Sequence, residues 1–344
     1  MRLKRFNFLV LIVLLALSVQ LVSAKSKHSK VLENNAVWLD TDGNPINAHG
    51  GSILFHKGTY YWYGEIKDGK TWLVPGQNWL CYRTNAGGVA CYSSKNLVKW
   101  KFEGKALAPE MTDSASDIHF SRVLERPKVI YNEKTNKFVM WLHVDSQDYS
   151  YARAGLAISD KPAGPFTYIE SIRPNGQMSR DMTIFKDDNQ RAYLIYSSEN
   201  NATTHISELS DDYLKPLPIF KRVFINQHRE APAVFKYNNK YYIVSSGCTG
   251  WQPNKALLAV ADSLLGEWKN LGNPCRGDLK DVTFGGQSTF VLPVQGQKNA
   301  FIFMADVWNM KDLADSRYNW LPVVIENETI SIPWRQSFHQ QEKK

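Results

Sequence analysis

The sequence predicts an all-β fold, a five-bladed β-propeller, from three observations. Short runs rich in Tyr, Trp, Phe, Val and Ile recur, turn-forming residues separate them in pairs, and no long stretch has a helical period. The pairs return roughly every fifty residues, and units of about four strands at such a spacing are typical of propeller blades. A β-sandwich with irregular loops is the alternative fold, although it needs no repeat of this length.

The second strand of each expected hairpin follows a turn such as Lys57-Gly58 or Asn238-Asn239. In chain order these second strands are 59–63, 138–142, 192–196, 241–244 and 300–304. Each of the first four hairpins is followed by another strand and then by a turn that contains Ser or Asp. A large apolar residue comes after each of these turns: Trp100, Phe166, Leu214 and Trp268. Because no Pro-, Gly- or Ser-rich linker divides the chain, we expect residues 25–344 to form a single five-bladed propeller domain.

The first 24 residues have the composition of a secretory signal peptide. The basic residues Arg2, Lys4 and Arg5 precede the apolar run 6–22, and small residues follow it. We expect cleavage after residue 24, which gives a secreted or periplasmic protein with no membrane association. An N-terminal membrane anchor is the alternative, because the run is only slightly short of a span. Whether the mature protein is free or tethered stays open.

Composition and motifs exclude several function classes. The net charge of +8 comes from scattered Lys and Arg residues, so we do not expect nucleic-acid binding. The sequence has no phosphate loop, no dinucleotide fingerprint and no Gly-x-Ser-x-Gly motif. No calcium loop is recognisable and the cysteine spacings are not those of a zinc site, so no cofactor is expected, a structural calcium ion being left open. We expect a monomer.

Export makes disulfides possible for the four cysteines. Cys81 and Cys91 flank a turn-like stretch and could lie across a hairpin, which would leave Cys248 and Cys275 to pair. All three connectivities are compatible with the sequence.

Polar residues stand just before each hairpin, where the innermost strand of a blade begins. Because these strand starts surround one mouth of the central channel, their side chains are expected to converge. Three of the five positions carry a carboxylate, Glu125, Asp181 and Glu230, each beside an arginine. Glycoside hydrolysis needs one carboxyl group to protonate the leaving oxygen and a second group to handle water. For any one of these carboxylates alone, an interblade ion pair is the alternative interpretation.

These motifs resemble glycoside hydrolase family 43 over about residues 36–334. Glu230-Ala231-Pro232 before a Tyr-Tyr strand, and Asp181 before Phe185, carry the resemblance. Similarity to the exo-β-1,3-galactanase group of the family rests on residues 48–51 (AHGG), 60–65 (YYWYGE), 179–183 (SRDMT) and 285–288 (GGQS).

The resemblance implies inverting hydrolysis that releases galactose from the non-reducing end of β-1,3-galactan, such as an arabinogalactan backbone. Glu230 matches the general acid, and Asp181 matches the carboxylate that tunes and orients it. Gln287 matches the residue that holds the water and is a candidate to deprotonate it, and Glu125 matches a further required acid. The Asp base that most of the family has in the first blade is absent here, as in the galactanase group. The partner would be galactan or arabinogalactan.

Which group activates water stays open at this point. An amide is a very poor base unless it reacts through its imidic tautomer, so Glu125 is a physical alternative to Gln287. The rival functions are a β-galactosidase, α-L-arabinofuranosidase or β-xylosidase of the same family, and a non-catalytic sugar-binding propeller. Retention of three carboxylates argues against the last, because binding alone needs no acid of high pKa.

Further candidates for sugar binding follow other strands. Glu65 ends an aromatic strand and is expected to accept hydrogen bonds from sugar hydroxyls, and His49 to contact the sugar or support the site. Tyr149, in a polar loop, is expected to stack on a ring or donate a hydrogen bond. The resemblance places four more residues in the sugar pocket: Asn200, Asn201, Thr249 and Trp251. Trp62, Trp141 and Trp308 are expected to pack between blades.

Overall fold

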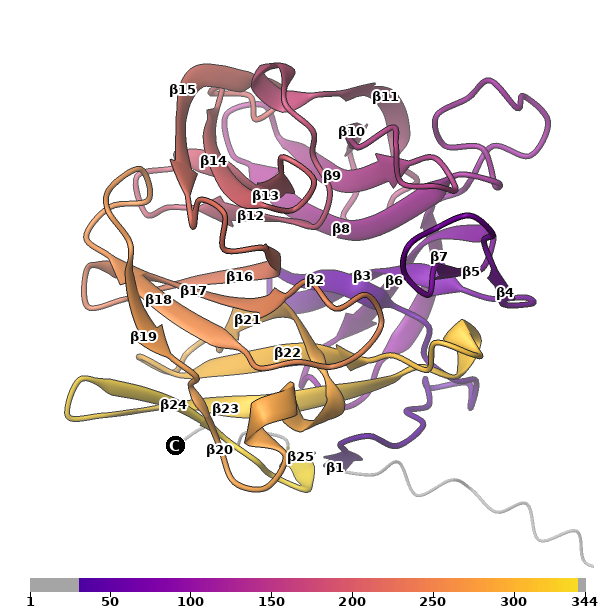
Figure 1. The fold of residues 1–344 in the computed structure, drawn as a ribbon. Coiled ribbons are helices and arrows are strands. Elements are labelled where there is room, and N and C mark those ends of the chain that lie inside the picture. Colours follow the sequence, from indigo (N-terminus) through magenta and orange to yellow (C-terminus); the bar gives the residue numbers. More distant parts are fainter. Residues whose placement is uncertain (1–30, 340–344) are drawn as a thin grey trace, which may run out of the picture.

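Five antiparallel sheets surround a central channel, which confirms the predicted five-bladed β-propeller (Figure 1). The structure is a computed structural model and describes residues 31–339. The expected signal peptide and the last five residues lie outside this range. Among the described residues, no helix has the length and apolarity that a membrane crossing requires.

Each blade is a meander of strands that runs outward from the channel. Blade I consists of β2 (His49–His56), β3 (Thr59–Lys67), β6 (Ala86–Ser94) and β7 (Lys101–Leu107). Blade II consists of β8 (Val123–Asn132), β9 (Lys137–Asp145), β10 (Arg153–Ser159) and β11 (Thr167–Ile172). Blade III consists of β12 (Met182–Lys186), β13 (Ala192–Ser198), β14 (Thr203–Leu209) and β15 (Pro216–Val223).

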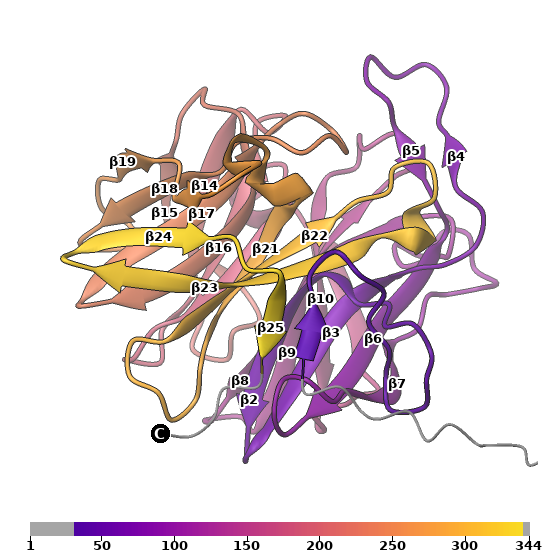
Figure 2. The ribbon, with the colours of Figure 1, turned by 90° about the horizontal axis from the view of Figure 1, so that it is seen from below.

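Blades IV and V complete the ring. Blade IV consists of β16 (Arg229–Tyr237), β17 (Lys240–Gly247), β18 (Leu257–Ala261) and β19 (Lys269–Gly272). Blade V consists of β21 (Gln287–Pro293), β22 (Phe301–Val307), β23 (Arg317–Glu326) and β24 (Thr329–Pro333), with β20 (Cys275–Arg276) added in parallel at its outer edge. Two segments from opposite ends of the chain, β1 (Val31–Glu33) and β25 (Ser337–His339), pair with each other (Figure 2).

The hydrophobic core is divided among the five blade-to-blade interfaces, with one apolar cluster in each. Alternating side chains of each strand fill these layers, because successive residues point to opposite faces of a sheet. Trp62 of blade I packs against Trp320 of blade V with ring centroids 5.1 Å apart. Trp62 and Trp141 are 1% and 0% exposed, as expected for packing between blades.

A β-bulge interrupts the innermost strand of several blades just past its start. The pairing register shifts after His49, Glu125 and Glu230, and the next residues Gly50, Arg126 and Ala231 all have positive φ. Proline follows in blades II and IV, where its missing N–H suits a position without a ladder hydrogen bond. The repeated Glu-x-Pro motif therefore encodes a bulge that re-aims the glutamate at the channel mouth.

One long insertion leaves blade I at this mouth. Residues 68–85, called the strap below, contain the short strands β4 (Trp72–Leu73) and β5 (Tyr82–Arg83), which pair with each other. Figure 2 shows this hairpin projecting beyond the sheet of blade I. The strap contacts blade IV, because the Trp251 Nε1–H donates to the carbonyl of Tyr82 over 3.1 Å. Short 3-10 helices are η1 (Pro174–Gly176), η2 (Lys280–Gly285) and η3 (Leu313–Asp315).

The cysteine pairing considered from the sequence is wrong, because all four cysteines are free. Cys91 lies inside the core between blades I and II. The strap carries Cys81 away from it to blade II, where the Sγ atom lies 4.0 Å from the carbonyl of Gln147. Cys275 is buried between blades IV and V, whereas Cys248 lies at the channel mouth.

Candidate active site

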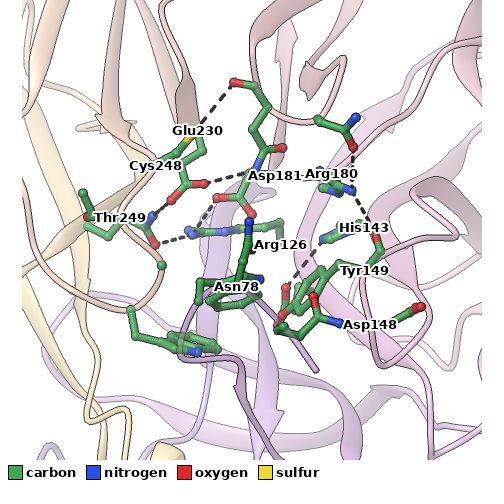
Figure 3. Close-up of a pocket in the computed structure, with 18 residues that line it drawn as sticks. Asn78, Arg126, His143, Asp148, Tyr149, Arg180, Asp181, Glu230, Cys248 and Thr249 are labelled. Atoms are coloured by element: carbon green, nitrogen blue, oxygen red, sulfur yellow. Dashed lines mark hydrogen bonds and ion pairs between the residues drawn. The ribbon is translucent and has the colours of Figure 1, made fainter. Parts of the chain in front are cut away.

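The channel mouth holds a cavity of about 760 Å³ that receives side chains from the inner strands and the loops beside them (Figure 3). Nine sequence-predicted residues line it, from blades II to V: Glu125, Tyr149, Asp181, Asn200, Asn201, Glu230, Thr249, Trp251 and Gln287. Two predicted residues, His49 and Glu65, do not line it. The structure thus brings together residues that are up to 162 positions apart in the chain.

Glu230 lies at the bulge of β16, with both carboxyl oxygens held by amides. Its Oε1 accepts a hydrogen bond from Gln287 Nε2 over 2.9 Å, and its Oε2 accepts one from Asn201 Nδ2 over 3.3 Å. Burial, together with repulsion from the Asp181 carboxylate, raises the pKa of Glu230 to about 8, against the opposing effect of Arg126. Glu230 is therefore mostly protonated at neutral pH and can donate a proton.

Gln287 begins β21 and uses all of its hydrogen-bonding capacity within the protein. Its Oε1 accepts from Arg126 Nη2 over 2.6 Å and from Trp308 Nε1 over 2.9 Å. Its Nε2 donates to Glu230 and, over 3.0 Å, to the Ser246 hydroxyl. Arg126 and Trp308 can only donate, which fixes the orientation of the amide. Trp308, expected to belong to the blade packing, thus contacts the site.

Arg126 lines the cavity and links three blades. Its guanidinium forms an ion pair with Asp181 of blade III over 2.9 Å and donates to the Ser288 carbonyl of blade V over 3.2 Å. The Arg126 side chain is 5% exposed, so water screens this ion pair only weakly. Asp181 is fixed by an interblade ion pair and is at the same time close enough to Glu230 to raise its pKa. The structural and functional interpretations of this carboxylate therefore both apply.

Glu125 is an ionised carboxylate, in contrast to Glu230. Its Oε1 accepts from Lys67 Nζ over 2.9 Å and from the Tyr149 hydroxyl over 3.1 Å. Burial would raise its pKa, but Lys67, His143 and Arg83 outweigh burial and hold the pKa well below its usual range. Glu125 Oε2 lies 3.6 Å from His143 Nδ1, an ion-pair distance rather than a hydrogen bond, so this oxygen is less constrained than Oε1.

Lys67 and His143 supply the charge that keeps Glu125 ionised. Lys67 also pairs with Glu65 over 2.8 Å, and its Nζ lies 5.4 Å from the ring centre of Trp251. His143 lies between Glu125 and Asp145, whose Oδ2 is 2.8 Å from His143 Nε2. Although burial opposes it, these two acids raise the pKa of His143 to about 9. The imidazole is therefore a cation at neutral pH.

His49 and Glu65 support the site from behind the cavity. His49 Nδ1 lies 3.1 Å from Asp306 Oδ1, and the His49 ring stacks on Tyr318. Glu65 is 2% exposed, and burial raises its pKa to about 7 despite the attraction of Lys67. Neither side chain lines the cavity, so direct sugar contact by either residue stays a prediction.

The remaining predicted residues form the rim. Asn200 and Asn201 follow β13 with positive φ, and Asn200 Oδ1 accepts from Arg180 over 3.3 Å. Thr249 donates to the Gln252 carbonyl over 2.6 Å, so a hydrogen-bonded turn and not a disulfide holds it. Trp251 stands edge-on to Trp308 with centroids 5.1 Å apart.

Several residues of the site were not predicted. The sequence could have indicated Lys67 and His143, because residues two apart in a strand point to the same face of the sheet. This alternation puts Lys67 on the same face as Glu65, and His143 on the same face as Asp145. Arg126 was noticed beside Glu125 but given no role. The strap residues had no signal at all: Gln77, Asn78 and Trp79. Other unassigned lining residues are Asp148, Arg180, Cys248 and Gly250.

Within residues 31–339, one group of possible metal ligands lies in this cavity. Ligand atoms of Glu125, His143 and Asp181 lie within 4.8 Å of one another. The set fits a cation poorly, because Lys67 and Arg126 already neutralise the two carboxylates and the raised pKa of His143 keeps its ring protonated.

Comparison with known proteins identifies relatives with this architecture. A family 43 β-1,3-galactosidase, solved with galactodeoxynojirimycin, is 45% identical with a TM-score of 0.83, over 90% of this chain and 100% of that one. The exo-β-1,3-galactanase from Phanerochaete chrysosporium, solved as a variant with β-1,3-galactotriose, is 35% identical with a TM-score of 0.80, over 90% and 68%. The enzyme from Clostridium thermocellum is 37% identical with a TM-score of 0.78, over 90% and 66%.

No curated protein matches the chain. The model of glycosyl hydrolases family 43 matches residues 43–307, which include every inner strand and all the carboxylates described above. The chain therefore belongs to glycosyl hydrolases family 43.

Proposed function

We propose that this protein is an exo-acting glycoside hydrolase that releases galactose from the non-reducing end of β-1,3-galactan with inversion at the anomeric carbon. One observation carries the proposal: a protonated carboxyl, Glu230, and an ionised carboxylate, Glu125, line one cavity. Two carboxyl groups whose pKa values are pushed apart can divide acid and base roles at one pH. The substrate follows from relatives named as β-1,3-galactosidases and exo-β-1,3-galactanases.

Glu230 is the general acid in this mechanism. It gives its proton to the glycosidic oxygen as the bond to the anomeric carbon breaks, and galactan shortened by one sugar leaves. Asp181 keeps the proton on Glu230 until then, and the amides of Gln287 and Asn201 stabilise the carboxylate that remains. Hydrogen bonds that strengthen as charge develops lower the barrier selectively.

Glu125 is the better candidate for the group that activates water. Both acceptor positions of the Gln287 oxygen are occupied by Arg126 and Trp308, so no lone pair is free for a water proton. The imidic tautomer would place a hydroxyl against those same donors, which cannot accept its proton. Gln287 therefore orients Glu230, while the less constrained Oε2 of Glu125 takes the proton from water attacking the opposite face of the sugar.

The strap accounts for action at chain ends. Trp79 lies so close to Gly250 that a Cβ there would meet its ring at 3.0 Å, and Trp251 is bonded to Tyr82. The strap thus joins blade I to blade IV along the rim, and the cavity has a wall where an open groove would continue. A pocket closed by such a wall admits the end of a galactan chain.

We also propose a secreted or periplasmic location for the enzyme and a monomeric state.

The test is incubation of residues 25–344 with β-1,3-galactan, with products resolved over time and the anomer followed by proton NMR. Galactose that appears first as the α-anomer supports the proposal, whereas the β-anomer would contradict inversion. Glu230→Gln should abolish turnover and keep binding, and full activity of this variant would refute the assigned acid. Release from arabinosides or xylosides instead would favour those activities of the family, and binding without release would favour a sugar-binding propeller.

A second experiment separates the two candidates for water activation. Azide needs no base, so it should restore turnover to Glu125→Ala and yield α-galactosyl azide. Gln287→Ala should lose activity through a misaligned acid and gain nothing from azide. Rescue of Gln287→Ala alone would reverse the assignment.

A further inference from the structure

Three consecutive non-glycine residues beside the cavity have left-handed backbone conformations. Glu199, Asn200 and Asn201 have φ values of 53°, 54° and 64°. Left-handed conformations are costly for residues with a Cβ, and they persist where surrounding contacts determine them. The turn is therefore held in place by its neighbours, and it carries two of the residues that line the cavity.

The Glu199 carboxylate is the anchor of this turn. It accepts hydrogen bonds from Arg222 Nε over 2.6 Å and Arg222 Nη2 over 2.7 Å, from the Thr203 hydroxyl over 2.9 Å, and it lies 2.9 Å from His205 Nε2. The fork of Arg222 binds both carboxylate oxygens, an arrangement that fixes direction as well as position. All these partners belong to strands β14 and β15 of the same blade. Glu199 itself does not line the cavity.

The turn places Asn201 on the Glu230 carboxyl. Asn201 Nδ2 is 3.3 Å from Glu230 Oε2, while Gln287 holds the other oxygen. A donor at Oε2 contributes most when Glu230 becomes a carboxylate, which happens only when it has given its proton to the leaving group. The link from Glu199 to Asn201 therefore bears on proton donation.

We propose that Glu199 is a positioning residue that acts through Asn201 on the proton donation by Glu230. The inference rests on the proposed function, because it presupposes that Glu230 is the general acid. Its consequence is specific: loss of the anchor harms reactions whose leaving group needs a proton and spares those whose leaving group does not.

The experiment compares two substrates on purified variants of residues 25–344. β-1,3-Galactobiose needs a proton on its leaving oxygen, whereas the fluoride of β-galactosyl fluoride departs with little assistance. The variants are Glu199→Ala and Arg222→Met, the second of which removes a half-exposed side chain and weakens the same anchor. Glu208→Ala is the matched control, because Glu208 of the same blade forms an ion pair with Arg191 and lies away from the cavity.

We expect kcat on galactobiose to fall about tenfold in Glu199→Ala, the equivalent of one net hydrogen bond, with the fluoride rate little changed. Arg222→Met should show the same selective loss in smaller degree, and it carries the test if Glu199→Ala does not fold. Glu208→Ala should leave both rates near wild type. Equal losses on both substrates, or no loss, would overturn the inference. A wild type inert on both substrates would instead refute the proposed function.

Discussion

Replacement of Asp181 by asparagine tests whether its charge keeps Glu230 protonated. The substitution preserves the shape of the side chain and an oxygen for the hydrogen bond to Arg126, which is 2.9 Å away. It removes the negative charge that, after burial, is the main cause of the raised pKa of Glu230, and leaves the opposing Arg126 in place. The pKa of the acid must therefore fall.

The size of the effect follows from the pKa of about 8. At pH 7, about nine tenths of a group with that pKa is protonated. Removal of a neighbouring charge moves a pKa by about 1–3 pH units, so a value near 6 is expected, at which about one tenth is protonated at pH 7. The rate should thus fall roughly tenfold at pH 7 and hardly at all at pH 5.

The assay is kcat/KM for galactan hydrolysis between pH 4 and 10. The basic limb of the profile should lie near pH 8 in the wild type and about two pH units lower in Asp181→Asn. Asp188→Asn, in an exposed residue of the same blade, is the control and should leave the profile unchanged. A uniform loss at every pH, with the basic limb unmoved, would refute the electrostatic role of Asp181.

Three further predictions concern stability. Lys67→Met leaves Glu125 and Glu65 buried without their shared cation and should cost about 3–5 kcal/mol in chemical denaturation, and a loss under 1 kcal/mol would contradict the pairing. Burial lowers the pKa of Lys128 to about 7, below its value of about 10.4 in an unfolded chain, so the native state loses stability as pH falls from 10 to 7. The unfolding free energy of Lys128→Met should therefore rise relative to that of wild type as pH falls across this window. A difference in unfolding free energy that stays constant with pH would contradict this. Reducing agent should not change Tm, and denatured protein should titrate as four thiols.

The fold could be predicted from the sequence because its signals are local. Turn residues between aromatic strands specify hairpins. The further strand and turn that follow each of the first four hairpins indicate about four strands per unit. The Glu-x-Pro motifs at Glu125 and Glu230 also predicted part of the site, since matching positions in repeated units must converge on one axis. The positions of Asp181 and Gln287 followed by the same reasoning.

The site was predicted less completely, and the failures have a common cause. Nothing in the sequence around Glu65 or His49 indicates that the folded protein buries them, Glu65 at 2% exposure and His49 against Asp306 of blade V. Cys81 and Cys91 are close in the chain, but the strap separates them in space. The strap itself has no periodic pattern, so its Trp79 was not connected with blade IV.

The sequence by itself determined the number of blades, the strand order within each and the convergence of Glu125, Asp181 and Glu230, because period-two alternation and turn chemistry act over a few residues. Only the tertiary structure decided which of these groups holds a proton. The pKa of Glu230 in blade IV depends on burial and on Asp181 of blade III. The pKa of Glu125 in blade II depends on burial and on Lys67 of blade I. Electrostatic environment arises from residues that are distant in the chain, and it exists only once the ring of blades has closed.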